Sequence, residues 1–109
     1  MTKSKSVDLK KLTTFSEGAI LSKVIAEGEE SETTLFCMAK GTSLSEHTSG
    51  REAKILVLEG KGTFTFSDKE VSLPGKEVSL LPGVFIFMPK RTKHSLKAQD
   101  DLAFLLILS

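Results

Sequence analysis

Short apolar runs separated by turn-forming residues are the feature that most restricts the fold of this chain. The runs are rich in Val, Ile, Leu and Phe, and Gly, Pro, Ser and Asp stand between them, while no long window has a helical period. This pattern predicts an all-β domain, either a sandwich or a barrel. Eight strands are expected, at residues 19–27, 33–39, 54–60, 62–66, 77–81, 84–89, 93–98 and 102–108.

The length of the chain sets the number of domains. With 109 residues, the chain can build one hydrophobic core and is too short for two. We expect a single domain over residues 1–109, in which an N-terminal segment, 1–17, precedes a barrel at about 18–109. The single cysteine, Cys37, cannot form an internal disulfide, so the fold must rest on packing.

Charge and hydropathy argue against two classes of partner. Fifteen Lys and Arg residues against fourteen Asp and Glu residues give a formal net charge of +1, and both signs are scattered along the chain. Neither a nucleic acid nor a membrane is therefore expected as a partner. The polar N-terminus carries no signal-like apolar run, and no later run is long enough to span a bilayer. We expect a soluble, cytoplasmic protein.

The last run, 102–108, is apolar at every position, so we expect it to be covered on both faces. One face would meet the barrel core and the other a further strand or a second subunit. Leu56 and Leu58 are expected on the same outer surface, because they alternate with the inward Ile55 and Val57. A homodimer is the simplest cover for this surface.

A seven-residue unit is repeated in the second half of the chain. "KEVSLPG" at 69–75 is followed directly by "KEVSLLPG" at 76–83, which indicates a duplication. Because seven is odd, a continuous strand through both copies would turn every inward side chain outward. We therefore expect residues 68–76 to form an arm, with the second copy supplying the strand.

Two stretches, 41–60 and 83–98, each carry one histidine among turn-forming residues. Together they resemble the paired motifs of the cupin superfamily, whose members are β-barrels with jelly-roll topology. The first motif reads G-x5-H-x-H-x3,4-E-x6-G, and its fixed positions fall here on Gly41, His47, Ser49, Ala53 and Gly60. The second reads G-x5-P-x-G-x2-H-x3-N, and its fixed positions fall on Gly83, Pro89, Arg91, His94 and Ala98.

The resemblance implies a metal site between the two motif strands, built in the family from three histidines and a glutamate. In this chain, only His47 and His94 keep those ligand types. Tight sites for Zn, Ni, Fe, Mn or Cu normally use at least three protein ligands. The candidate third donors are Cys37, Glu46 and Glu52, although strand alternation places both glutamates on the opposite face unless a bulge intervenes.

Two functions follow from this reduced motif. The leading hypothesis is a binding module that holds a small molecule or a weakly held divalent transition metal ion, in a pocket lined by His47, Ser49 and His94. Arg91, with Lys90 and Lys93 beside it, would bind the carboxylate of such a ligand if its side chain folds over the barrel mouth. The alternative is a metal-dependent cupin enzyme, of the dioxygenase or isomerase type, in which one of the candidate donors completes the site.

Overall fold

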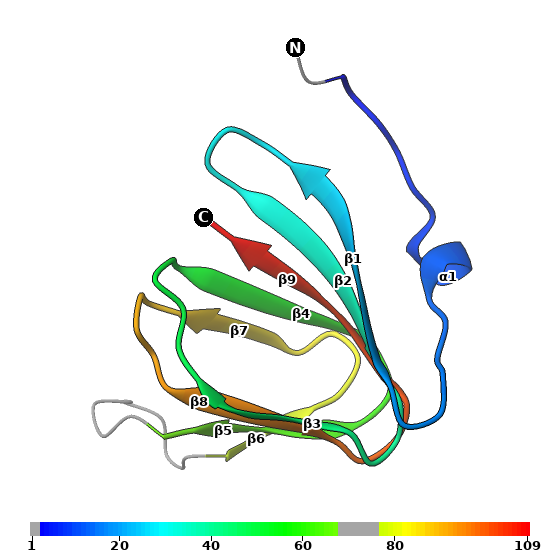
Figure 1. Cartoon of the computed structure of the whole chain (residues 1–109), viewed down its shortest axis with the longest axis vertical. Coiled ribbons are helices and arrows are strands. Elements are labelled where there is room, and N and C mark those ends of the chain that lie inside the picture. The colour runs from blue at the N-terminus through cyan, green and yellow to red at the C-terminus, as the bar shows by residue number, and fades with distance from the viewer. Residues whose placement is uncertain (1–2, 68–76) are drawn as a thin grey trace.

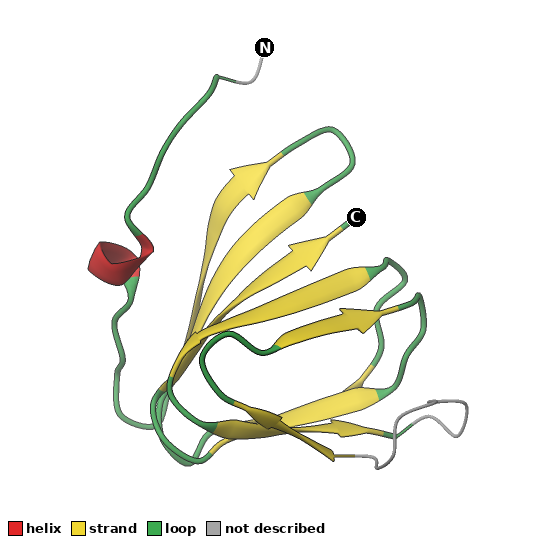
Figure 2. Ribbon diagram, turned by 180° about the vertical axis from the view of Figure 1, so that it is seen from behind, coloured by secondary structure: helices red, strands yellow, loops and turns green. Residues whose placement is uncertain are grey.

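The computed structural model describes residues 3–67 and 77–109, and this part of the chain forms two facing β-sheets (Figures 1 and 2). One sheet has the strand order β1-β2-β9-β4-β7, and the other has the order β3-β8-β5-β6. The sheets approach each other where β8 turns into β9 and diverge toward the β1–β2 hairpin (Figure 1). The elements are α1 (Leu9–Leu12), β1 (Ile20–Glu27), β2 (Glu32–Met38), β3 (Ser43–His47), β4 (Ala53–Glu59), β5 (Gly62–Phe66), β6 (Glu77–Leu80), β7 (Phe85–Met88), β8 (His94–Ala98) and β9 (Leu102–Leu108).

The all-β prediction is confirmed, and each of the eight expected strands is present. Sequence reasoning missed β3, because "SLSEH" carries one apolar residue and lacks the alternation that indicates a strand. It also missed α1, a single helical turn. Asp8 caps this turn, because its carboxylate accepts a hydrogen bond from the Lys10 N–H. Within the described residues the two sheets face each other without closing into one hydrogen-bonded barrel.

The main core lies between the sheets and follows from strand alternation. In β4, Ile55 and Val57 are buried while Lys54 and Leu56 are half-buried on the outer side, as the sequence predicts. Facing β4, the inward Phe64 and Phe66 of β5 pack edge to face, with ring centroids 4.7 Å apart. These aromatic and branched side chains fill the space between the sheets, which is the main source of stability expected for a chain without a disulfide.

A second cluster covers the outer face of the five-stranded sheet. Leu35, Cys37 and Ala103 point outward there, and the N-terminal segment packs on them through Leu9, Leu12 and Phe15. The sequence predicts another strand or a second subunit as the outer cover of β9, and on this part of β9 the cover is a segment of the same chain. Cys37 is buried in this cluster, on the face of the sheet opposite the histidines, where it packs as a small apolar side chain.

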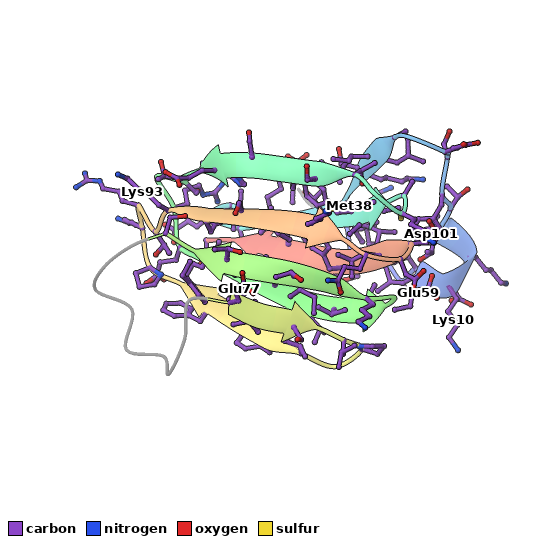
Figure 3. All side chains as sticks on the ribbon, turned by 90° about the horizontal axis from the view of Figure 1, so that it is seen from below. Lys10, Met38, Glu59, Glu77, Lys93 and Asp101 are labelled. Atoms are coloured by element: carbon purple, nitrogen blue, oxygen red, sulfur yellow. The ribbon has the colours of Figure 1, made fainter. Side chains whose placement is uncertain are left out.

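Glu59, at the end of β4, lies at the end of the molecule opposite Lys93 (Figure 3). The next residue, Gly60, lies where the β4–β5 connection meets the β8–β9 turn. Its φ is +95°, and a Cβ atom there would lie 1.9 Å from the Asp101 carbonyl oxygen. Any side chain would force the two connections apart, which explains a glycine at the end of the first motif.

The repeat is only partly covered by the described residues. The second copy supplies β6, which pairs with β5, as predicted. The expected arm at 68–76 lies outside the described residues. No helix in 3–67 or 77–109 is long and apolar enough to cross a membrane.

Candidate functional site

His47 and His94 face each other across neighbouring strands. They are directly opposed in the antiparallel β3–β8 pair, and their ring centroids are 4.1 Å apart with an interplanar angle of 60°. The motif positions predict both histidines on adjacent strands with their rings converging inside the barrel, and the adjacent strands and the close approach of the rings are as predicted. Their surroundings differ, however, because His94 is only 5% exposed whereas His47 lies at the solvent-exposed end of β3.

A β-bulge in β3 brings His47 to the inner face. Leu44 pairs with Leu96 and His47 with His94, so Ser45 and Glu46 together stand opposite Ser95. In a regular strand, alternation from the inward Leu44 would turn the His47 side chain outward, because the two residues are three positions apart. The bulge instead leaves Ser45 and Glu46 on the outer face, where both line a groove with outward residues of β5 and β8.

Backbone carbonyls hold both imidazole rings. Nδ1 of His47 lies 2.7 Å from the Ser45 carbonyl oxygen, and Nδ1 of His94 lies 2.9 Å from the Thr92 carbonyl oxygen. A carbonyl oxygen can only accept, so each Nδ1 carries the proton and donates it. In the neutral rings the lone pair is therefore on Nε2. This arrangement orients histidines that bind metals, and it equally presents two hydrogen-bond acceptors.

The environment of His94 favours the neutral ring. Its pKa is lowered below 6.5, chiefly because burial removes the charged form from water; the Thr92 carbonyl opposes this shift and the neighbouring His47 adds to it. Phe64 lies parallel to the His94 ring, with centroids 5.4 Å apart and planes 6° apart. Phe66 is the residue directly opposite His94 on β5. At neutral pH, His94 is an uncharged acceptor in an aromatic setting.

The other predicted pocket residues, Ser49 and Arg91, meet through the backbone. The Arg91 N–H donates to the Ser49 carbonyl oxygen over 2.8 Å, which ties the β7–β8 connection to the β3–β4 connection beside the histidines. The Ser49 hydroxyl oxygen accepts from the Arg51 N–H over 3.1 Å, so it already has a partner. Arg91 is exposed and has a φ of +67°, the conformation that the glycine of the family motif supplies.

The three candidate third donors do not join the histidines. Cys37 lies under the N-terminal segment, Glu46 faces the outer groove, and Glu52 is exposed ahead of β4. In the described part of the chain, no group of three or more His, Cys, Asp or Glu side chains is placed to hold a metal ion. The described residues thus supply two imidazoles of the four ligands that the family resemblance implies.

Sequence reasoning missed the residues that shape the histidine pair. Thr92 contributes a carbonyl, which no side-chain pattern reveals, and its hydroxyl donates to the Pro89 carbonyl oxygen over 2.9 Å, stabilising the turn before β8. Phe64 and Phe66 are core residues that also lie beside His94, Phe64 with its ring parallel to the imidazole and Phe66 on the opposed position of β5. The alternation in "GTFTF" gives their inward direction, but their contact with His94 depends on which strands are neighbours.

Comparisons with known proteins agree with this geometry. The family profile described as "Cupin domain" matches residues 34–108. A crystal structure of a cupin superfamily protein from Desulfitobacterium hafniense is 23% identical, with a TM-score of 0.80 over 99% of this chain and 93% of the other. An RmlC-like cupin protein from Desulfovibrio desulfuricans is also 23% identical, with a TM-score of 0.82 over 98% and 97% of the two chains.

A conserved protein of unknown function from Streptococcus pyogenes has the same fold, at 22% identity and a TM-score of 0.79 over 99% of this chain and 89% of the other. At such identities the structures support the fold alone. No curated protein matches the sequence. The family profile covers more than half of the chain, and the two histidine motifs lie within the matched residues. The chain therefore belongs to the cupin family.

Proposed function

We propose that this protein is a small cupin binding module whose ligand contacts the Nε2 atoms of His47 and His94. The observation that carries the proposal is the pair of Nδ1 hydrogen bonds to backbone carbonyls, which fixes both rings with their lone pairs on Nε2. A ligand that suits two neutral imidazoles is either a divalent transition metal ion or a small molecule that donates hydroxyl or N–H groups.

The described donors fit a weakly held ion better than a tight one. Two imidazoles leave most coordination positions to water or to a bound molecule, whereas tight sites use at least three protein ligands. When bound, an ion such as Zn²⁺ or Ni²⁺ would supply Lewis acidity to a molecule beside it. The chain's own contribution is to orient the two rings and to keep His94 uncharged next to Phe64 and Phe66.

Titration calorimetry on protein made without an affinity tag tests the proposal, with Ni²⁺, Zn²⁺ and Cu²⁺ as probes. The chain has two histidines, so imidazole-dependent binding must occur at this pair. We expect one ion per chain, with affinity reduced about tenfold or more in His47→Gln and in His94→Gln, because each removes half of the imidazole ligands. Binding that is unchanged in both variants would exclude the pair as the metal site.

Two matched controls separate this module from the metal-dependent enzyme that the family resemblance also allows. Cys37→Ser and Glu52→Gln change donors that lie apart from the histidines, so both should bind the ions like the wild type. If Glu52→Gln weakens binding as much as His94→Gln does, a third protein donor joins the ion. That result would support the enzyme in place of the binding module.

We further propose that the chain forms a homodimer through the part of the outer face that the N-terminal segment leaves open. Phe85 and Phe87 on the edge strand β7 are 57% and 47% exposed. Phe85 pairs with the half-buried Leu56, which pairs in turn with Leu105 of β9. A second copy placed on this strip would remove a continuous row of apolar side chains from water.

A further inference from the structure

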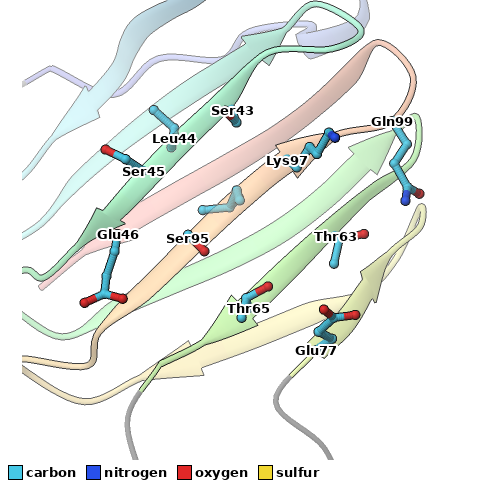
Figure 4. Close-up of a pocket in the computed structure, with 11 residues that line it drawn as sticks. Ser43, Leu44, Ser45, Glu46, Thr63, Thr65, Glu77, Ser95, Lys97 and Gln99 are labelled. Carbon is cyan, nitrogen blue, oxygen red and sulfur yellow. The ribbon is translucent and has the colours of Figure 1, made fainter.

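A second candidate site lies on the outer face of the four-stranded sheet, where the structure has a shallow groove across β3, β8, β5 and β6 (Figure 4). Strand alternation separates it from the histidines: His94 points inward, whereas its neighbour Ser95 lines the groove. The bulge in β3 adds to this separation, because it sends His47 inward and Ser45 and Glu46 outward.

Short hydroxyl side chains and longer polar side chains line this groove together. The hydroxyl residues are Ser43, Ser45, Thr63, Thr65 and Ser95, and the longer residues are Glu46, Glu77, Lys97 and Gln99. Glu46 and Glu77 lie on the two outer strands of the sheet, β3 and β6, and Lys97 lies on β8 between them (Figure 4). Small residues flanked by long ones leave a hollow in an otherwise flat sheet surface.

The hydroxyl groups are arranged in register. Thr63 pairs with Lys97 and Lys97 with Ser43, while Thr65 pairs with Ser95 one step further along the strands. Neighbouring strands lie about 4.8 Å apart and same-face residues about 7 Å apart, so the hydroxyls form a two-row array. The side-chain hydrogen bonds within the described part of the chain are made by other residues, which leaves this array available to a ligand.

The chemistry of the groove selects among ligand classes. An apolar ligand would find little surface to pack against, since the side chains of Leu44 and Leu96 pack in the core on the other face. An anion would meet Glu46 and Glu77, and a cation would meet Lys97 in the centre. Hydroxyls donate and accept, carboxylates accept, and the ammonium and amide groups donate, so the groove matches an uncharged ligand that offers many donors and acceptors.

From these observations we infer that the outer groove binds a neutral polyhydroxylated molecule of the saccharide or polyol class. Such a ligand places hydroxyls along its length, so it can bond to both rows of the array at once. Among the described residues that line the groove, none has an aromatic side chain on which a sugar ring could stack. The affinity then rests on hydrogen bonds that compete with water, and a dissociation constant on the order of 1 mM is expected.

Amide NMR of ¹⁵N-labelled full-length protein tests the inference, with maltotriose and sorbitol as neutral probes and spermidine and citrate as charged ones. At about 10 mM probe, well above the expected dissociation constant, maltotriose or sorbitol should shift amides of β3, β5 and β8 in the groove. The double variant Thr63→Val/Thr65→Val keeps the side-chain shape and removes two hydroxyls, and it should bind about tenfold more weakly. Thr33→Val, on the outer side of the other sheet, is the matched control and should bind normally.

Three results would overturn the inference. Shifts with spermidine or citrate and none with the neutral probes would mean that charge governs the groove. Shifts that appear around His47 and His94 and leave the groove unchanged would place the ligand at the imidazole pair. The absence of groove shifts with every probe, in protein whose spectrum shows an intact fold, would leave the hydroxyl array without a ligand of this class.

Discussion

Arg91→Gly is expected to stabilise the protein, although it removes a whole charged side chain. Arg91 has a φ of +67°, and in the described part of the chain it is the non-glycine residue with a positive φ. This left-handed conformation costs a residue with a Cβ atom about 1–2 kcal/mol of free energy, and it costs glycine almost nothing. The backbone bond from the Arg91 N–H to the Ser49 carbonyl oxygen does not involve the side chain, so it is kept in the variant.

The size of the gain follows from two opposing terms. Glycine makes the unfolded chain more flexible, which costs about 0.4–1 kcal/mol of stability. Subtracting this from the relieved strain leaves a net gain of about 0.5–1 kcal/mol, or roughly 2–6 °C in Tm for a domain of this size. Lys90→Gly is the matched control. Lys90 is an exposed neighbour in the same turn without a positive φ, so glycine there makes the unfolded chain more flexible and relieves no backbone strain.

Urea unfolding of the wild type and both variants measures these terms, with equal m-values required for the comparison. We expect the midpoint to rise for Arg91→Gly and to fall for Lys90→Gly. If both variants lose stability by similar amounts, the Arg91 side chain makes contacts that offset the whole of the strain. The reasoning from φ alone would then be refuted, and a binding role for the guanidinium would gain weight.

Three further predictions follow. Burial lowers the pKa of His94, so the folded chain takes up a proton less readily than the unfolded chain; the stability from this group is complete above about pH 6.5 and is lost as the pH falls through the lowered pKa. Urea midpoints between about pH 7.5 and 5 should therefore fall more for the wild type than for His94→Gln, and equal slopes would contradict the burial effect. Deleting residues 69–75 should cost about 1 kcal/mol or less, because the second copy already supplies β6, and a deletion variant that fails to fold would show that the first copy is indispensable. Light scattering should give a dimer mass at micromolar concentration for the wild type and a monomer mass for Phe85→Lys/Phe87→Lys; Leu81→Lys, an exposed apolar residue outside the strand, is the control that should stay dimeric. A monomeric wild type would refute the dimer.

The sequence was most informative where side-chain alternation and turn residues determine the structure. The apolar runs predict eight of the strands, and the two motifs predict that His47 and His94 lie on neighbouring strands. The histidine placement rests on the resemblance to the cupin motifs, whereas the strands depend on local patterns of side chains in the sequence. The inward direction of Ile55 and Val57 was predicted for the same reason.

Features that depend on packing between distant segments could not be predicted in this way. The N-terminal segment covers Cys37 and β9, and nothing in its few apolar residues indicates which surface they meet. The bulge in β3 breaks the alternation on which strand prediction relies. Ser45 and Glu46 therefore made the strand hard to predict, and they also determine the direction of His47. The histidine rings donate hydrogen bonds to the Ser45 and Thr92 carbonyl oxygens, and a motif of side-chain types cannot predict bonds to the backbone.

The bulge also changes what a length variation would do at this position. In a regular strand, losing one residue moves every following side chain to the opposite face. Here two residues, Ser45 and Glu46, occupy the space opposite one, so losing either of them restores simple alternation between Leu44 and His47. A homologous chain that is one residue shorter in this strand would still direct its histidine inward. Alignments of such chains should therefore place the gap inside β3 and keep the histidines in one column.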